Sequence, residues 1–255
     1  MKKNAFTLAE VLITLGIIGV VAALTMPALI ANYQQKALKT QYAKAYSNLF
    51  NAIKLAQANL DYPIGCSYWD ANPTGCSAKC VGYNEYDECN SWTCQDGSAL
   101  PSEYNGPRGD CQAFEQELFH NVLKPIKFCK DHALANGCIT TDFKGIDEVK
   151  KEQTPTGNFN PNGGWAKTNI QNNYSAYVLA DGTIIMKYGV EGTGSYPIYT
   201  IDINGRKKPN KWGYDIFTFE VFGDSTSGIK YISPITYATE TGGVSGAQMQ
   251  QQLNQ

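Results

Sequence analysis

A single apolar stretch near the amino terminus constrains this chain more than any other feature. Residues 6–31 read FTLAEVLITLGIIGVVAALTMPALIA, and Glu10 is the one charged side chain among them. As a helix, a run of this length covers the roughly 30 Å hydrocarbon core of a bilayer. Lys2 and Lys3 precede it, and the positive-inside tendency keeps such a start in the cytoplasm. We expect one membrane-spanning helix with the following domain outside the cytoplasm.

The two ordinary interpretations of such a segment fit it poorly. A cleaved secretory signal offers an Ala-x-Ala-like site just after its apolar core, and residues 20–33 contain none. A plain membrane anchor gives Glu10 no role, although an acidic side chain costs roughly 2.5–3.5 kcal/mol at mid-bilayer. We therefore expect Glu10 to have a partner and a function.

The residues around Glu10 resemble a known processing signal. The leader KKNA at residues 2–5, followed by FTLAEVL at residues 6–12, is similar to the class III signal of type IV prepilins and type II secretion pseudopilins. The resemblance implies that a prepilin peptidase removes residues 1–5 by cutting between Ala5 and Phe6, and that it methylates the new terminus at Phe6. Family members usually have Gly before the cut, where this chain has Ala5.

The resemblance also gives Glu10 and Pro27 expected roles in assembly. Cleavage creates an amine at Phe6, and in a filament the amine of one subunit would neutralise Glu10 of its neighbour in the low-dielectric core. Family members carry a proline at the distance of Pro27, which is expected to kink or locally melt the helix. The implied partners are further copies of the chain in a helical filament, the peptidase and an inner-membrane assembly platform. The filament is a type IV pilus or a type II secretion pseudopilus, on the cell surface or in the periplasm.

Residues 32–60 continue the helical pattern as an amphipathic segment. Apolar side chains recur there at spacings of three or four, which describes one face of a helix. In a pilin-like fold this face packs on a small antiparallel sheet, so the expected class is α+β with a long N-terminal helix. The residues of the face are Leu38, Tyr42, Ala45, Leu49, Ile53, Ala56 and Leu60.

We place the sheet in residues 171–240. Tyr174–Ala180 and Thr183–Tyr188 flank Asp181-Gly182, a hairpin signal of the type I′ kind. Two further segments alternate apolar and polar residues as strands do, with Phe217, Phe219 and Val221 on one side of the second. These segments are 198–203 and 216–222. After the sheet, residues 241–255 are rich in Gln and are expected to form a flexible tail.

All eight cysteines lie between residues 66 and 138. A zinc site would need closer Cys or His pairs than Cys76 and Cys80 with His120 and His132 provide. An even number of cysteines among Gly, Asn, Asp and Pro fits up to four disulfides, which persist in an oxidising compartment. Residues 61–170 are therefore expected to form a loop-rich insertion held by disulfides rather than by a large core, with the pairing left open. The cysteines are Cys66, Cys76, Cys80, Cys89, Cys94, Cys111, Cys129 and Cys138.

The connection between the last two predicted strands is rich in oxygen-bearing side chains. Asp202, Asn204, Asn210 and Asp215 are candidate ligands of a calcium ion, which takes six to eight oxygens from such groups. The loop resembles one near the C terminus of pilin-like proteins, some of which bind calcium there. Gly205 is misplaced for an EF-hand, and the loop also carries Arg206, Lys207, Lys208 and Lys211. The alternative is a turn-rich connection whose Asp and Asn side chains cap their own backbone.

Other function classes find less support. The formal net charge is -2 and the basic residues form no stripe, so nucleic acid is not an expected partner. The chain lacks Gly-x-Ser-x-Gly, His-Glu-x-x-His and phosphate-loop motifs, so we expect neither an enzyme nor an organic cofactor. The alternative to a filament subunit is a membrane-tethered extracytoplasmic binding or adhesion module that does not polymerise. Its contact surface would use aromatic residues of the cysteine-rich region, which otherwise form a small core over the disulfides: Tyr68, Trp69, Tyr83, Tyr86 and Trp92.

Overall fold

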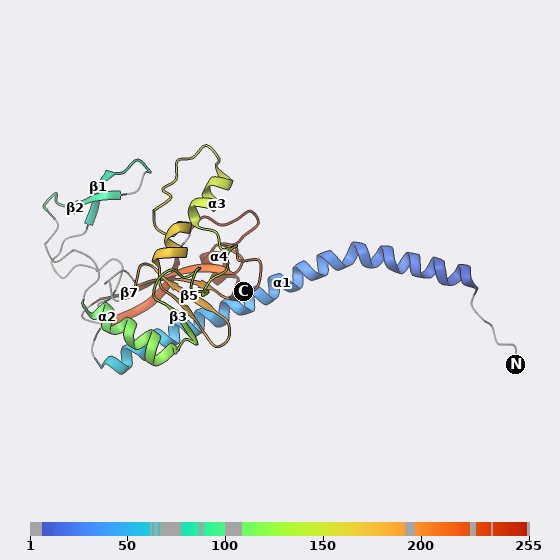
Figure 1. Cartoon of the computed structure of the whole chain (residues 1–255), viewed down its shortest axis with the longest axis horizontal. Helices are drawn as coiled ribbons and strands as arrows, with labels where there is room; N and C mark the ends of the chain where they lie inside the picture. Colours follow the sequence, from blue (N-terminus) through green and yellow to red (C-terminus); the bar gives the residue numbers. More distant parts are fainter. Residues whose placement is uncertain are drawn as a thin grey trace. The chain divides into compact units, whose positions relative to one another are not determined.

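The computed structural model describes residues 7–61, 63, 66, 78–86, 89–99, 109–191, 197–224, 228–235 and 237–253. The chain forms two compact units, residues 1–40 and 41–255. Helix α1 (Leu8–Leu60) supplies the described part of the first unit and continues into the second (Figure 1). The single long helix predicted from the two consecutive apolar patterns is confirmed.

In the first unit, α1 carries apolar side chains that are exposed in the described part of the chain. Leu12, Ile18 and Leu24 are all strongly exposed. Among the described helices, α1 is long and apolar enough to cross a membrane. It remains helical through Pro27, because a single missing backbone donor still leaves hydrogen-bonded turns on both sides. The expected role of Pro27 in assembly stays a prediction.

The second unit is built on an antiparallel sheet, which in the described part of the chain has six strands in the order β3-β4-β5-β6-β7-β8. The predicted strands 198–203 and 216–222 are confirmed as β6 and β7, while β3 and β8 lie at the two edges. The strand bounds are β3 Lys127–Cys129, β4 Ala176–Val178, β5 Ile184–Lys187, β6 Ile198–Asp202, β7 Ile216–Asp224 and β8 Gly228–Ile235.

The part of α1 in the second unit packs on one face of this sheet. Tyr42, Leu49 and Ile53 are buried, as the amphipathic pattern predicts. The Tyr42 ring lies edge-on to Phe217, with centroids 4.7 Å apart, and 5.8 Å from the ring of Phe219. Each fully buried side chain of this kind contributes roughly 1.5–3 kcal/mol. The predicted inward side of β7 is therefore confirmed.

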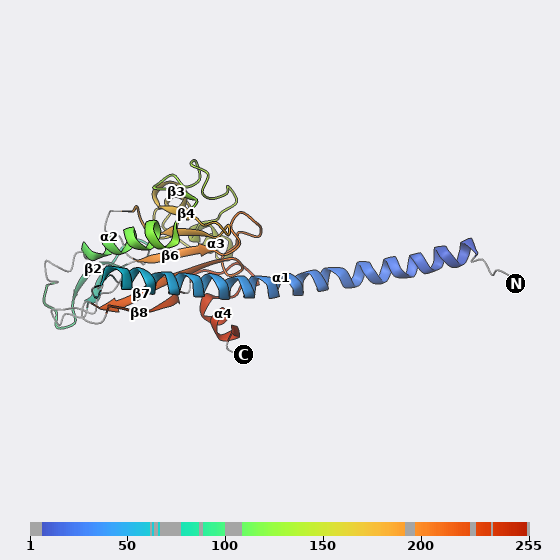
Figure 2. The same cartoon turned by 90° about the horizontal axis from the view of Figure 1, so that it is seen from below.

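A second helical segment covers the same face beside α1 (Figure 2). Helix α2 (Gly109–Gln116) continues as the π-helix η2 (Glu117–Leu123). The Phe119 ring stacks on the Tyr177 ring of β4, with centroids 3.8 Å apart, and lies edge-on to the Tyr199 ring of β6, with centroids 5.4 Å apart. Tyr199 is the direct register partner of Phe219, so α1 and α2 share one face of the sheet.

The opposite face is covered by residues 129–174 and by the segment after β8, whose Tyr237 and Ala238 pack against the same cluster. This layer includes helix α3 (Ile146–Gln153) and the π-helix η3 (Asn169–Asn173). Phe143 and Trp165 join Met186 of β5 in one buried cluster. The prediction that residues 61–170 lack a large core is therefore wrong for this part. Its apolar residues are spaced irregularly, so neither the helical nor the strand period reveals them.

The hairpin predicted at Asp181-Gly182 exists, but its turn differs. β4 and β5 pair antiparallel, and Gly182 donates its N–H to the Leu179 carbonyl at 3.0 Å. Gly182 has φ +90°, whereas Asp181 is not among the described residues with positive φ. A type I′ turn needs positive φ at both central residues, so this is a longer loop in which Gly182 alone is left-handed. The Asp181 side chain accepts the N–H of Thr183 at 3.1 Å instead.

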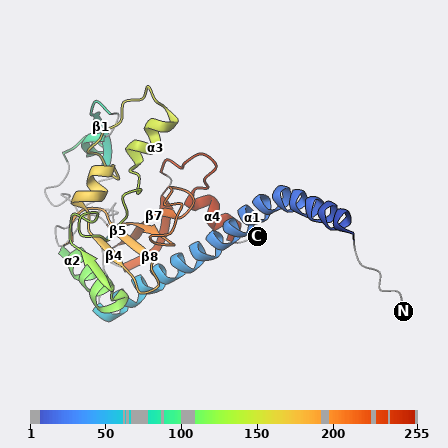
Figure 3. The ribbon, with the colours of Figure 1, turned by 45° about the vertical axis from the view of Figure 1, so that its right-hand side comes forward.

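The end of the chain is ordered into helix α4 (Gly246–Leu253), which corrects the predicted flexible tail. Met249 is buried, and the buried Tyr42 hydroxyl donates to the Gly246 carbonyl at 3.0 Å. Figure 3 shows α4 beside the part of α1 that carries Tyr42. Ser245 and Gln248 exchange reciprocal hydrogen bonds at the helix start. This Ser-x-x-Gln capping box was present in the sequence as a helix signal.

Disulfides form as the cysteine pattern predicts. Cys66 is bonded to Cys111, and Cys129 to Cys138. Cys80 and Cys94, in the antiparallel strands β1 (Ala78–Tyr83) and β2 (Cys89–Cys94), are also disulfide-bonded. No cysteine within the described residues is free. Cys76 and the side chain of Cys89 lie outside the described residues.

Candidate functional site

The start of α1 is stabilised by a capping box. Glu10 Oε2 accepts hydrogen bonds from the N–H and the hydroxyl of Thr7, both at 2.8 Å. The Glu10 N–H donates in return to Thr7 Oγ1 at 3.3 Å. Since α1 begins at Leu8, Thr7 is the N-cap and Glu10 the third helical residue, which are the positions of this motif. The Thr-x-x-Glu spacing of residues 7–10 carries this signal in the sequence.

This arrangement fixes the one carboxylate of the apolar segment. Glu10 lies at the positive end of the helix dipole, where negative charge is favoured. Along the sequence the next charged residue is Lys36. Ala5 and Phe6, at the predicted cleavage site, lie outside the described residues. Within the part of α1 that the structure describes, Glu10 is thus held by Thr7.

The comparison with known families bears on this same end of the chain. Residues 1–26 match the family model for the prokaryotic N-terminal methylation motif. This motif is the processing signal of type IV pilins and type II secretion pseudopilins. The chain carries a prepilin signal. No curated protein and no solved structure matches the chain.

The prepilin signal and the fold agree with each other. A long N-terminal helix followed by an antiparallel sheet and disulfides is a pilin-like α+β architecture. The signal implies processing by a prepilin peptidase and filament assembly in general. It points to a structural rather than a catalytic protein. The apolar helix that follows the signal is consistent with the membrane anchoring of a pilin.

The predicted calcium loop, residues 202–215, contains two deeply buried carboxylates. Asp202 and Asp215 are 1% and 0% exposed. Asp215 accepts the N–H of Asn210 at 2.9 Å and that of Lys211 at 2.7 Å, while Asp202 accepts the N–H of Asn204 at 3.3 Å. These bonds match the alternative interpretation, in which the side chains cap their own backbone.

In the folded chain a further acidic side chain, that of Asp142, contacts this loop. Asn210 donates its side-chain N–H to both carboxylate oxygens of Asp142 at 3.1 Å. The side-chain oxygens of Asn204 and Asn210 are buried and accept no hydrogen bond from the described residues. Burial and the nearby Asp215 charge raise the pKa of Asp202 well above its usual range. Asp142 is distant in sequence, so spacing within the loop gave no signal for it.

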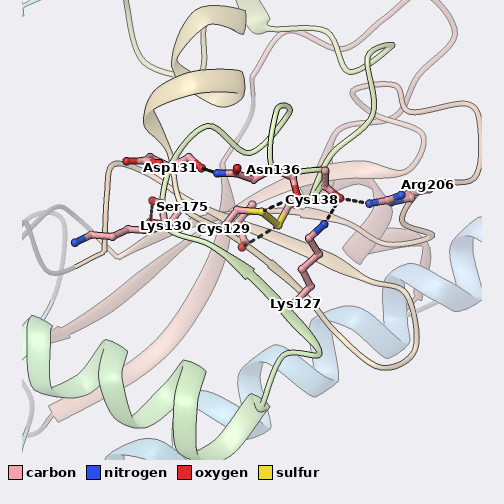
Figure 4. Close-up of a disulfide and its surroundings, with 10 residues drawn as sticks. Lys127, Cys129, Lys130, Asp131, Asn136, Cys138, Ser175 and Arg206 are labelled. Carbon is pink, nitrogen blue, oxygen red and sulfur yellow. Dashed lines mark hydrogen bonds between the residues drawn. A yellow bond between two sulfur atoms is a disulfide. The ribbon is translucent and has the colours of Figure 1, made fainter.

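The disulfide between Cys129 and Cys138 lies next to this loop (Figure 4). The Gly137 carbonyl accepts hydrogen bonds from Lys127 Nζ at 3.2 Å and from the Arg206 guanidinium. A Cβ atom at residue 137 would lie 3.1 Å from Lys127 Nζ, and φ there is +70°. The left-handed φ favours glycine here, and the two hydrogen bonds connect the disulfide loop to residues 202–215.

The other residues considered for metal binding or for a contact surface, two histidines and several aromatic residues, are dispersed. His120 Nε2 lies 2.6 Å from Glu191 Oε1, and His132 Nδ1 lies 3.0 Å from Asp131 Oδ1. In the described part of the chain, no group of three or more His, Cys, Asp or Glu side chains is arranged to hold a metal ion. Tyr83 is 65% exposed and Tyr86 is half-buried. Tyr68, Trp69 and the side chain of Trp92 lie outside the described residues.

Proposed function

We propose that this chain is a structural subunit, a pilin or pseudopilin, of a type IV pilus or a type II secretion filament. The observation that carries the proposal is the prepilin signal joined to an exposed apolar segment, residues 6–31, in which Glu10 is the one charged side chain. The proposed precursor is held in a bacterial inner membrane with its sheet domain outside the cytoplasm. The disulfides support that location, because they persist in oxidising compartments.

The apolar half of α1 is exposed among the described residues of its unit and requires an apolar environment. Its exposed side chains from Leu8 to Ile30 need lipid or other helices around them. A helix satisfies its own backbone in either environment, and helices in a bilayer associate through close packing. The same segment therefore serves as the membrane anchor of the precursor and as the core of a filament.

Glu10 gives a reason for assembly over simple anchoring. A carboxylate in an apolar bundle is costly unless a positive group lies beside it. Cleavage before Phe6 creates such a group on every subunit, and Thr7 keeps the Glu10 carboxylate at the helix end where that group arises. In the proposed filament, the amine of one subunit neutralises Glu10 of the next.

Processing is tested by the mass of the N-terminal peptide of protein purified from membranes that contain the peptidase. We expect a peptide that begins at Phe6 and carries one added methyl group. An intact Met1 terminus would leave a tethered module without processing. A start beyond residue 20 would mean that the segment is a secretory signal.

Assembly is tested by Glu10→Ala, with Thr14→Ala as the matched control. Thr14 donates to the Glu10 and Val11 carbonyls and does not touch the Glu10 carboxylate. We expect Glu10→Ala to stay in the membrane but to disappear from sheared filaments, while Thr14→Ala assembles. If filaments form normally without Glu10, or if neither protein is recovered in filaments, the membrane-tethered binding module is the better interpretation.

We also propose that the loop formed by residues 202–215 binds calcium in the mature protein. Asp202, Asp215, Asn204 and Asn210 would supply oxygens to the ion. The support is the pair of buried amide oxygens, of Asn204 and Asn210, that accept no hydrogen bond from the described residues, together with the two buried carboxylates of the same loop. Calcium would take such oxygens as ligands and neutralise the carboxylates.

This proposal is tested by thermal unfolding of the detergent-solubilised chain in millimolar calcium and in chelator. Binding raises the melting temperature of the wild-type protein as the calcium concentration exceeds Kd. We expect Asp202→Asn to lose this shift and the distant Asp147→Asn to keep it. Identical melting of the wild-type protein with calcium and with chelator would contradict the site.

A further inference from the structure

A lysine and a glutamate meet in the interior between α2 and β5. Lys187 Nζ lies 3.4 Å from Glu115 Oε1, and the two side chains are 0% and 1% exposed. Lys187 also donates to the Val190 carbonyl at 3.3 Å. Burial raises the pKa values of the neighbouring Tyr177 and Tyr199, and the Glu115 charge adds to the effect on both. The pair is thus enclosed by the sheet on one side and the helix on the other.

The contact is poor for an ion pair in such a place. Neither carboxylate oxygen of Glu115 accepts a hydrogen bond of normal geometry from the described residues. Each buried ion costs several kcal/mol unless close pairing and further hydrogen bonds compensate it. A buried carboxylate that lacks hydrogen bonds of normal geometry is unusual in a folded protein and needs a physical explanation.

The same burial makes the two groups chemically suited to each other. It raises the pKa of Glu115 to about 7 and lowers the pKa of Lys187. One proton passing from the ammonium to the carboxylate gives a neutral amine beside a neutral carboxylic acid. The amine is the nucleophile and the acid the electrophile of an amide-forming reaction. Fixed contact at this distance replaces a bimolecular encounter by a step within the folded chain.

We propose that Lys187 and Glu115 condense after folding into an amide cross-link that joins α2 to β5. The bond forms between Lys187 Nζ and the carboxyl carbon of Glu115, and one carbon–oxygen bond of the carboxyl group breaks. The released oxygen leaves as water with the two protons that the nitrogen gives up. No oxidant, reductant or cofactor enters the balance. The product replaces two buried charges by one neutral amide.

The cross-link would extend a covalent path that the disulfide begins. Cys66 follows the end of α1 and is bonded to Cys111 near the start of α2. Glu115 is in the same helix and would bind β5, the third strand of the sheet order. Force on α1 would then reach β5 through the disulfide, helix α2 and the amide in series. This property is useful to a filament subunit, yet the bond forms within one chain and does not depend on assembly.

The intact mass of the reduced and alkylated wild-type chain tests the proposal directly. We expect it to be lower by one molecule of water than the processed sequence requires. A tryptic digest should contain one branched peptide that includes both Glu115 and Lys187. An unmodified mass, with the two residues found in separate linear peptides, would overturn the proposal.

Variants assign the water loss to these two residues. Lys187→Met should show the full mass, while Lys44→Met, which removes an exposed ion pair with Asp181, should keep the water loss. In Glu115→Gln, ammonia leaves in place of water, so the product should have the same mass as the cross-linked wild type. This second variant decides the matter even if Lys187→Met does not fold. Loss of water that persists in folded Lys187→Met would contradict the assignment.

Discussion

Glu10 and Thr7 form a reciprocal hydrogen-bonded pair at the start of α1, with the Glu10 carboxylate 2.8 Å from both the Thr7 nitrogen and hydroxyl. In the proposed filament this carboxylate would interact first with Thr7 and then also with the amine of a neighbouring subunit. Before assembly Thr7 satisfies it within one subunit, and after assembly the amine of a neighbour would add to these bonds. The capping box thus holds the charged group ready at the helix end.

Removal of the cap should loosen the first turn of α1. Loss of an N-cap side chain costs about 1 kcal/mol, which is roughly a factor of 5 in the opening equilibrium. We expect Thr7→Ala in detergent to exchange the amide hydrogens of residues 7–11 about fivefold faster, as measured by mass spectrometry. Thr7→Ser keeps the hydroxyl and should behave as the wild type. Unchanged exchange in Thr7→Ala would show that the cap does not stabilise this end.

The hydroxyl of Tyr42 should contribute to stability through α4. Tyr42→Phe keeps the ring on Phe217 but leaves the buried Gly246 carbonyl without this donor. We expect a loss of about 1–2 kcal/mol in urea unfolding, together with faster amide exchange in α4. Tyr231→Phe, at an exposed ring, is the control and should change stability little. Equal effects of the two changes would contradict a specific role of the bond.

The two described disulfides should differ in their contribution to stability. Cys66–Cys111 spans 45 residues and Cys129–Cys138 spans 9. Closure of the longer loop removes more entropy from the unfolded chain, about 4 kcal/mol against about 2.5 kcal/mol. We therefore expect the double Ser variant at 66 and 111 to melt at a lower temperature than the one at 129 and 138. The reverse order would show that native packing around Cys129 outweighs loop entropy.

Glu220 should make stability depend on pH. It is 8% exposed, and burial raises its pKa from 4.5 to about 7. The folded state then binds more protons than the unfolded state between these values, so stability falls as pH rises through this window. The contribution of this group is at most about 3 kcal/mol.

Comparison of Glu220→Gln with the wild type isolates this effect. The amide cannot ionise, so we expect the difference in unfolding free energy between variant and wild type to shift in favour of the variant from pH 4.5 to pH 7. Urea unfolding at several pH values measures it. Glu85→Gln, at an exposed position, is the control and should follow the wild type. A parallel pH profile for Glu220→Gln would contradict the assignment.

Local patterns were enough to predict several parts of the fold. The spacing of Tyr42, Leu49 and Ile53 identified the buried face of α1, because a helix repeats its faces every three to four residues. The alternation around Phe217 and Phe219 identified the inner side of β7 for the corresponding reason in a strand. The capping boxes at Thr7 and Ser245 were equally local, and close attention to the Thr-x-x-Glu and Ser-x-x-Gln spacings would have revealed both.

Contacts between distant residues were beyond such patterns. Phe143 and Trp165 lie in irregular segments and are buried in the same core cluster as Met186 of β5. Asp142 reaches Asn210 from another loop, and Glu115 of α2 meets Lys187 of β5. None of these pairs is separated by a helix or strand spacing in the sequence. The partners lie far apart along the chain, and only folding brings them into contact.

The sequence by itself determined that this protein begins with a prepilin signal and one long helix, with a carboxylate where apolar residues are required. These features depend on near neighbours in the chain, whose geometry a helix fixes. The tertiary structure decided which cysteines pair, which loop faces the predicted calcium ligands and which charges are buried together. Those outcomes depend on how the sheet brings distant segments into contact, and packing rather than local preference determines that.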